Sequence, residues 1–199
     1  MKKPHRKVVV FATLISVLTL TSALLLALAP APLTPDASSS LFAVDQPESM
    51  DVIFQTQVAP RAARWKYIYI HQSCTASGNA ASLSRGTVGL GDHFVIGNGE
   101  GAIDGEIQIG QRWNQQLPAH PPAGATGIDP ACISICLIGD FDHAMPTPTQ
   151  VRRLAQLVNA LQSRFDIPAG KVLMMHESGG ATGVGKYFPT TAFREQLLP

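Results

Sequence analysis

The sequence predicts a single α/β domain with a mixed central β-sheet flanked by helices. Short β-rich runs bounded by turn residues recur after Trp65, and one later segment has the capping and periodicity of a long amphipathic helix. A chain of 199 residues has room for one ordinary hydrophobic core after an N-terminal leader. We therefore expect residues 65–199 to form the domain.

The N-terminal segment has the charge pattern of an export signal. Its basic residues are Lys2, Lys3, Arg6 and Lys7, and an uncharged run over residues 8–29 follows them. As a helix rising about 1.5 Å per residue, this run approaches the roughly 30 Å thickness of a membrane interior. Residues 1–29 are thus predicted to be a signal peptide or an N-terminal membrane anchor. Prolines after the small-residue cleavage sites favour the anchor. Both alternatives place the domain in the periplasm, the cell envelope or the medium.

Residues 30–64 are rich in Pro, Ser and Ala and are predicted to be a linker. A short apolar patch at residues 50–54 is a candidate for packing on the domain, although nothing in the sequence requires it. The net charge of +1 gives no electrostatic reason to expect a nucleic-acid partner.

The predicted elements follow in order. Strands are expected at residues 67–70, 93–96, 106–109, 133–138 and 171–175. Glycine-rich turns between the second and third strands predict a hairpin. Thr147, Pro148 and Gln150 form a helix N-terminus with a capping box, and apolar residues at helical spacing continue to Phe165. A short helix over residues 190–198 is expected to close the domain.

The three cysteines leave at least one thiol unpaired. Cys132 and Cys136 on one strand would lie about 13 Å apart between Cα atoms, too far for a disulfide. A bridge from Cys74 to either of them stays open, and so does the alternative of small buried thiols.

Two histidines, His71 and His176, directly follow apolar strands. A strand end places a side chain at the rim of the sheet, where a cleft can accommodate a metal ion. An isolated histidine at such a position is more often structural, so the residues around each histidine decide its interpretation.

Four segments in order resemble the type 2 N-acetylmuramoyl-L-alanine amidase and peptidoglycan recognition protein family. The segments are Tyr69-Ile70-His71-Gln72-Ser73-Cys74-Thr75, Gly91-Asp92-His93-Phe94-Val95-Ile96, Ile133-Ser134-Ile135-Cys136-Leu137-Ile138-Gly139-Asp140-Phe141 and the stretch 171–189. The resemblance implies an amidase-like fold and peptidoglycan, through its muropeptide stem, as the partner. It also implies hydrolysis of the amide between N-acetylmuramic acid and L-alanine, with Zn²⁺ as cofactor.

Carrying the family's metal ligands over gives an incomplete set. His71 and His176 match the two histidine ligands, whereas Gly183 stands where a cysteine or aspartate is expected. The resemblance leaves Asp92 or Glu177 as replacement carboxylate ligands, because carboxylate oxygen is acceptable to zinc. Weak or absent zinc binding is the alternative.

Other functional positions of the family are also changed. Asp92 replaces a catalytic tyrosine and is the catalytic candidate, Ala181 replaces a proton-handling lysine or threonine, and Glu177 replaces an arginine. His120 resembles a residue of the loop that lines the peptide groove. His93 should face away from Asp92 and pack in the protein. Two functions stay open: an amidase with a nonstandard metal site, and a non-catalytic peptidoglycan-binding domain. If the leader is uncleaved, the membrane is a further partner.

Overall fold

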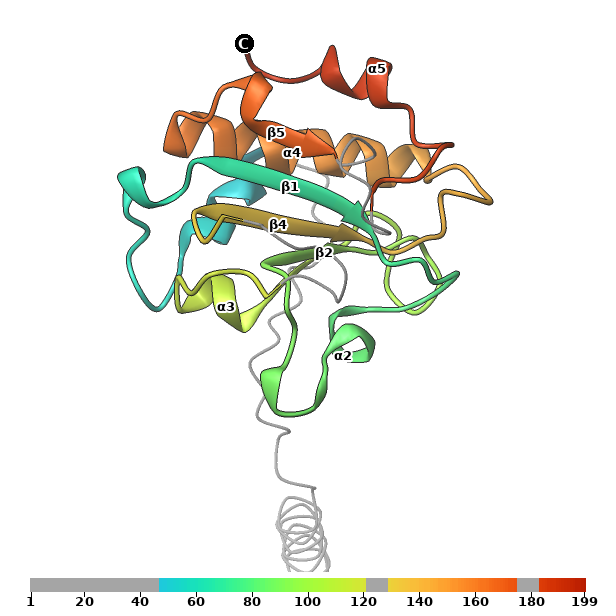
Figure 1. Cartoon of the computed structure of the whole chain (residues 1–199), viewed down its shortest axis with the longest axis horizontal. Coiled ribbons are helices and arrows are strands. Elements are labelled where there is room, and N and C mark those ends of the chain that lie inside the picture. Colours follow the sequence, from blue (N-terminus) through green and yellow to red (C-terminus); the bar gives the residue numbers. More distant parts are fainter. Residues whose placement is uncertain (1–46, 121–128, 175–182) are drawn as a thin grey trace, which may run out of the picture. The chain divides into compact units, whose positions relative to one another are not determined.

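The computed structural model describes residues 47–120, 129–174 and 183–199. Five strands form one sheet in the order β3-β2-β4-β1-β5. Figure 1 labels four of them, from β2 through β4 and β1 to β5. The strands are β1 (Tyr67–Gln72), β2 (Phe94–Ile96), β3 (Ile107–Ile109), β4 (Cys132–Leu137) and β5 (Val172–Met174). The pairs β1–β4, β1–β5 and β2–β4 are parallel and the β2–β3 pair is antiparallel, so the predicted mixed sheet and hairpin are confirmed.

The helices cover the sheet and its connections. The α-helices are α2 (Ala80–Leu83), α3 (Gln111–Asn114), α4 (Pro148–Phe165) and α5 (Thr190–Arg194). Short 3-10 helices are η1 (Pro47–Phe54), η2 (Ala62–Arg64), η3 (Gly86–Val88) and η4 (Ala169–Lys171). In Figure 1, α4 crosses behind the sheet, while α2 and α3 lie below β2.

The predicted capping box starts α4. Thr147 Oγ1 accepts from the Gln150 amide at 2.9 Å, and Gln150 Oε1 accepts from the Thr147 amide at 3.1 Å. The Gln150 side chain also donates to the Ile138 carbonyl oxygen at 2.8 Å, which ties the helix start to the residue after β4. The helix therefore begins at a defined place against the sheet.

Alternation along β1 and β4 separates the two faces of the sheet. Ile68, Ile70 and the corresponding isoleucines of β4 are fully buried and join the core cluster that includes the apolar side of α4. The alternate residues of β1 and β4, which include His71 and Cys136, face the other side. This second face carries the polar side chains discussed below.

The apolar patch before the predicted domain does pack on it. Met50 and Ile53 of η1 are buried in the main core cluster. Trp113 Nε1 donates to the Ile53 carbonyl oxygen at 2.6 Å, and the Phe54 ring lies 6.0 Å from that of Phe165. Part of the segment assigned to the linker thus contributes to the core, because its apolar residues cover the side of α4.

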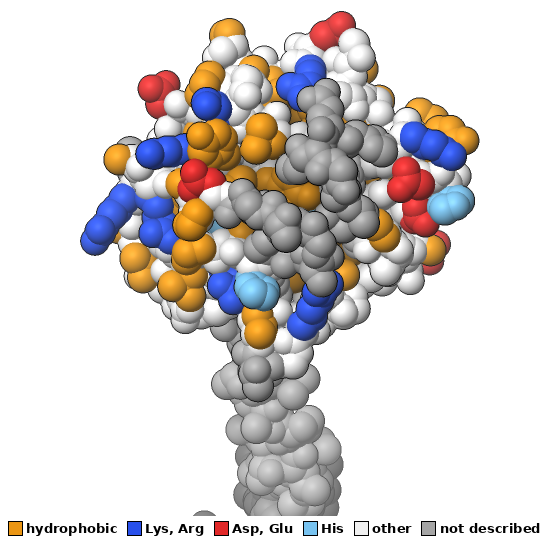
Figure 2. Space-filling view, viewed as in Figure 1, with side chains coloured by type: hydrophobic (Ala, Val, Ile, Leu, Met, Phe, Trp, Pro, Cys, Tyr) orange, Lys and Arg blue, Asp and Glu red, His pale blue; other side chains and the backbone are white. Residues whose placement is uncertain are grey.

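Charged side chains do not gather on the face shown in Figure 2, where lysine and arginine are spread around the edge of the described surface. Within the described ranges, no helix combines the length and hydrophobicity needed to cross a membrane. The predicted export segment, residues 8–29, lies outside those ranges.

Replacing Ile53 with alanine should lower the free energy of unfolding by about 2–5 kcal/mol, because a buried side chain leaves a cavity. Val52 is the matched control: it lies on the same turn with 36% exposure, so Val52→Ala should change stability by about 0.5 kcal/mol or less. Urea denaturation of the full-length protein measures both values. If both substitutions lowered the free energy of unfolding by the same small amount, η1 would not be part of the core.

Candidate functional site

The candidate site lies on the sheet face opposite α4, where β1 and β4 run side by side. β1 extends through Gln72, so His71 lies inside the strand and does not follow it as the sequence predicted. The extension arises because His71 and Gln72 continue the parallel register with Cys136 and Leu137. The pairing places the His71 side chain next to that of Cys136.

Asp92 reaches His71 from the segment that enters β2. Its Oδ1 atom lies 2.8 Å from His71 Nε2, and the two side chains are only 9% and 2% exposed. Two glycines allow this placement: a Cβ atom on Gly91 would lie 2.1 Å from the His120 carbonyl oxygen, and one on Gly110 would lie 2.4 Å from that of Asp92. Close backbone packing therefore holds the Asp92 carboxylate at the end of β1.

Ser134 and Tyr69 hold the pair in place. Ser134 Oγ donates to Asp92 Oδ1 at 2.5 Å and lies 3.5 Å from His71 Nε2. The Tyr69 ring stacks on the imidazole, with centroids 5.1 Å apart and an interplanar angle of 16°. Both neighbours come from the same face of the sheet, since Tyr69 is opposite Ser134 in the register.

The hydrogen bonds of His71 indicate that a proton or a metal ion lies between its ring and the Asp92 carboxylate. His71 Nδ1 lies 3.1 Å from the Gln72 carbonyl oxygen, an acceptor, so Nδ1 carries a hydrogen. Nε2 then faces the Asp92 carboxylate, and a lone pair there would be repelled. A proton on Nε2, or a metal ion between the two atoms, satisfies this contact.

The electrostatics of the metal-free pair follow from the same contact. Burial alone would lower the pKa of His71, but the Asp92 carboxylate and the nearby Cys136 thiol raise that pKa well above 6.5. Burial works against ionisation of Asp92 too, but His71 and the Ser134 hydrogen bond lower its pKa. The pair is therefore held as imidazolium and carboxylate.

Cys136 completes a set of donors of three kinds. Ligand atoms of His71, Asp92 and Cys136 all lie within 4.8 Å of one another. Imidazole nitrogen, carboxylate oxygen and thiolate sulfur are all accepted by zinc, so this chemistry fits the metal of the family. Burial raises the pKa of the free Cys136 thiol. The sequence analysis predicted a buried core thiol at Cys136. The alternation of Ser134 and Cys136 with isoleucines along β4 was the available signal that both side chains face the site.

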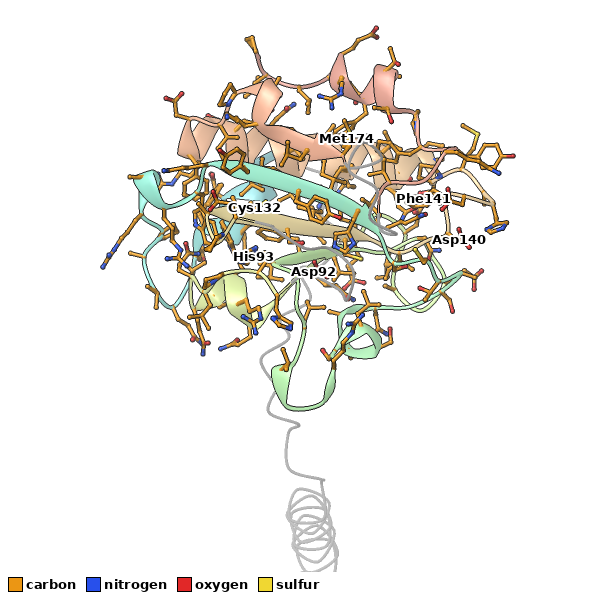
Figure 3. All side chains as sticks on the ribbon, in the orientation of Figure 1. Asp92, His93, Cys132, Asp140, Phe141 and Met174 are labelled. Carbon is orange, nitrogen blue, oxygen red and sulfur yellow. The ribbon has the colours of Figure 1, made fainter. Side chains whose placement is uncertain are left out.

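His93, labelled in Figure 3, is fully buried as expected, and its ring packs against those of Trp65 and Trp113. Its Nδ1 accepts from the Ser134 amide at 3.0 Å and its Nε2 lies 2.8 Å from the Leu117 carbonyl oxygen. Burial lowers the pKa of His93 to about 4. With both ring nitrogens occupied, a neutral His93 has no free lone pair for a metal.

A cleft of about 230 Å³ opens onto the cluster. His71, Asp92 and Cys136 line it together with His120 and Arg85. His120 is exposed and reaches the cleft because its amide donates to the Gly91 carbonyl oxygen at 2.8 Å. A ligand in the cleft would therefore meet both the buried donors and a basic edge.

Gly183 lies beside the end of β1. Its carbonyl oxygen accepts from the Gln72 amide at 3.2 Å, and a glycine offers no side-chain ligand. The other residues carried over from the closing segment, namely His176, Glu177 and Ala181, lie outside the described residues. Cys74, Cys132 and Cys136 are all free thiols, and only Cys74 is exposed.

Fold and site together define a class: an α/β protein whose mixed sheet carries buried histidine, carboxylate and thiol side chains at the floor of a cleft. Residues 61–187 match the family Amidase_2, N-acetylmuramoyl-L-alanine amidase. The chain belongs to this family, and the predicted membership is thereby confirmed. The family acts on peptidoglycan, which makes this an amidase-like, peptidoglycan-related protein.

Three solved structures are similar to this chain at low sequence identity. The endolysin N-acetylmuramoyl-L-alanine amidase LysCS from Clostridium intestinale URNW is 19% identical, with a TM-score of 0.47 over 71% of this chain and 90% of that one. PGRP-Hd from Alvinella pompejana is 16% identical, with a TM-score of 0.43 over 68% and 84%. Bumblebee PGRP-SA is 18% identical, with a TM-score of 0.46 over 64% and 80%. No curated protein sequence matches the chain.

Replacing Asp92 with asparagine should lower the pKa of His71 in metal-free protein. The substitution removes the carboxylate that raises this pKa and leaves the burial that lowers it, so His71 should lose its proton at lower pH than in the wild type. NMR titration of the imidazole in the presence of a chelator measures the change. Asp51→Asn, at an exposed position, is the control; an unchanged His71 titration in Asp92→Asn would contradict the ion pair.

Proposed function

We propose that this protein binds the stem peptides of peptidoglycan in the cleft and hydrolyses the amide between N-acetylmuramic acid and L-alanine. Family membership supplies the class of substrate. The observation that carries the catalytic part is the buried contact of His71 Nε2 with Asp92 Oδ1, which lies on the cleft floor and can exchange its proton for a metal ion. Buried, charged groups in a cleft are typical of functional sites.

The proposed metal is Zn²⁺. The proposed ligands are His71 and His176, which match the family's histidines, and Asp92, for which the sequence left Glu177 as the alternative. When bound, zinc would polarise the scissile carbonyl group and activate a water molecule. The chain's own residues support these ligands: Gln72 fixes the His71 tautomer through its carbonyl group, and Ser134 orients the Asp92 carboxylate. The Asp92 carboxylate stands in for the ligand absent at Gly183.

His120 and Arg85 are the proposed contacts for the muropeptide. Both line the cleft, and Arg85 can pair with a carboxylate of the stem peptide. We propose that the domain acts outside the cytoplasm, where peptidoglycan lies, with residues 1–29 as the export segment and residues 30–64 mainly as the linker. An uncleaved segment 8–29 would keep the protein at the membrane.

One observation favours a second function, peptidoglycan recognition without hydrolysis. Gly183 lies next to β1 without a side-chain donor, and the sequence has Ala181 in place of the proton-handling residue. A domain that keeps the cleft but lacks these groups could bind the stem peptide and leave the amide intact.

The test is incubation of the full-length protein with purified peptidoglycan, in the presence of zinc or of a chelator. Zinc-dependent release of new L-alanine N-termini is expected, and His71→Ala should reduce the release at least about 100-fold, as expected for a lost metal ligand. His143→Ala is the matched control, because the His143 side chain is 81% exposed. Co-sedimentation with peptidoglycan without any release would instead support recognition and would contradict hydrolysis.

A further inference from the structure

We propose that Cys136 is a further metal ligand at this site, so that β4 supplies a thiolate beside the Asp92 carboxylate. The inference rests on the proposed function, which gives the reason for a metal on the cleft floor. It goes beyond that function by assigning the thiol of a different strand to the coordination sphere.

The first support is the arrangement of the donor atoms. His71 and Cys136 are register partners on parallel strands, and the Asp92 carboxylate contacts His71 Nε2. Tetrahedral zinc with bonds of about 2.0–2.3 Å places its ligand atoms roughly 3.3–3.6 Å apart. The observed 2.8 Å contact would open by about half an ångström, and a thiol within 4.8 Å would close by about one ångström. Small side-chain rotations provide such movements.

The second support is the position of Gly183 relative to Cys136. The Ser73 amide donates to the Leu137 carbonyl oxygen of β4, whereas the Gln72 amide donates to that of Gly183. Successive amides of a strand point to opposite edges, so Gly183 flanks β1 on the side away from β4. A thiolate from Cys136 on β4 would thus reach His71 from one side of β1, whereas Gly183 lies on the other side.

The third support is that the other two cysteines are placed differently. Cys132 is buried on the same strand but is opposite Tyr67, four residues from the level of His71. Cys74 is exposed beyond the end of β1. Cys136 alone among the three cysteines belongs to the cluster of possible ligand atoms in the described part of the chain. Cys132 therefore offers a matched control.

X-ray absorption spectroscopy of the full-length protein, reduced and loaded with zinc, tests the proposal directly. The spectrum should contain one sulfur atom at about 2.3 Å from zinc. The same sulfur signal should persist in the double variant Cys74→Ser/Cys132→Ser, in which Cys136 is the one cysteine that remains. This result does not depend on whether a Cys136 variant folds.

The second measurement is zinc affinity by competition with a chromophoric chelator. Cys136→Ser should raise the dissociation constant at least about 100-fold, whereas Cys132→Ser should leave it within about twofold of the wild type. Circular dichroism checks that both variants are folded. An equal loss of affinity in the two variants would overturn the assignment.

The outcomes separate this inference from the proposed function. Zinc bound by nitrogen and oxygen alone, or a sulfur signal that disappears in the double variant, would overturn the Cys136 assignment and leave the amidase proposal standing. A sulfur ligand without release of L-alanine N-termini would support Cys136 and contradict hydrolysis. Failure to bind zinc would overturn both.

Discussion

The contact between His71 and Asp92 is the constraint on which the candidate site depends. It joins a residue inside β1 to a residue before β2, across the intervening strand β4, and both side chains are almost fully buried. Burying two charges is costly unless each finds partners, and Ser134 and the Gln72 carbonyl group supply them. The close packing at Gly91 and Gly110 keeps the carboxylate at this place. A cluster of this kind contributes little to stability compared with apolar packing, which favours a chemical role.

Much of the fold could be predicted because its signals are local. The capping box at Thr147, the apolar period along α4 and the turn residues of the β2–β3 hairpin each follow from neighbouring residues, and the structure has all of them. The boundaries were less accurate: pairing with β4 extends β1 to Gln72. The packing of η1 was an open alternative, because the burial of Ile53 depends on Trp113, sixty residues away in sequence. Such contacts leave no periodic pattern.

The site was predicted only in part, because some of its contacts join residues that are distant in sequence. His71 stood out through its motif, and Asp92 was named as a replacement carboxylate, which agrees with its position beside the His71 ring. Cys136 was assigned to the core because a lone cysteine in an apolar strand has that ordinary interpretation. Its proximity to His71 depends on the parallel register of β1 and β4, which a single sequence does not specify. His120 lines the cleft through the packing of its backbone on Gly91.

Family membership and catalytic competence are separate questions in this protein. The family match covers residues 61–187, whereas the sequence resemblance puts Gly183, which has no side-chain donor, where a ligand of the family is expected. The proposed function requires that His71 and Asp92 share a metal ion. Anomalous diffraction at the zinc edge from zinc-loaded crystals tests it: we expect a peak within about 2.0–2.2 Å of His71 Nε2 and an Asp92 oxygen. A His71–Asp92 contact that stays at 2.8 Å, with no anomalous peak beside it, would contradict the claim.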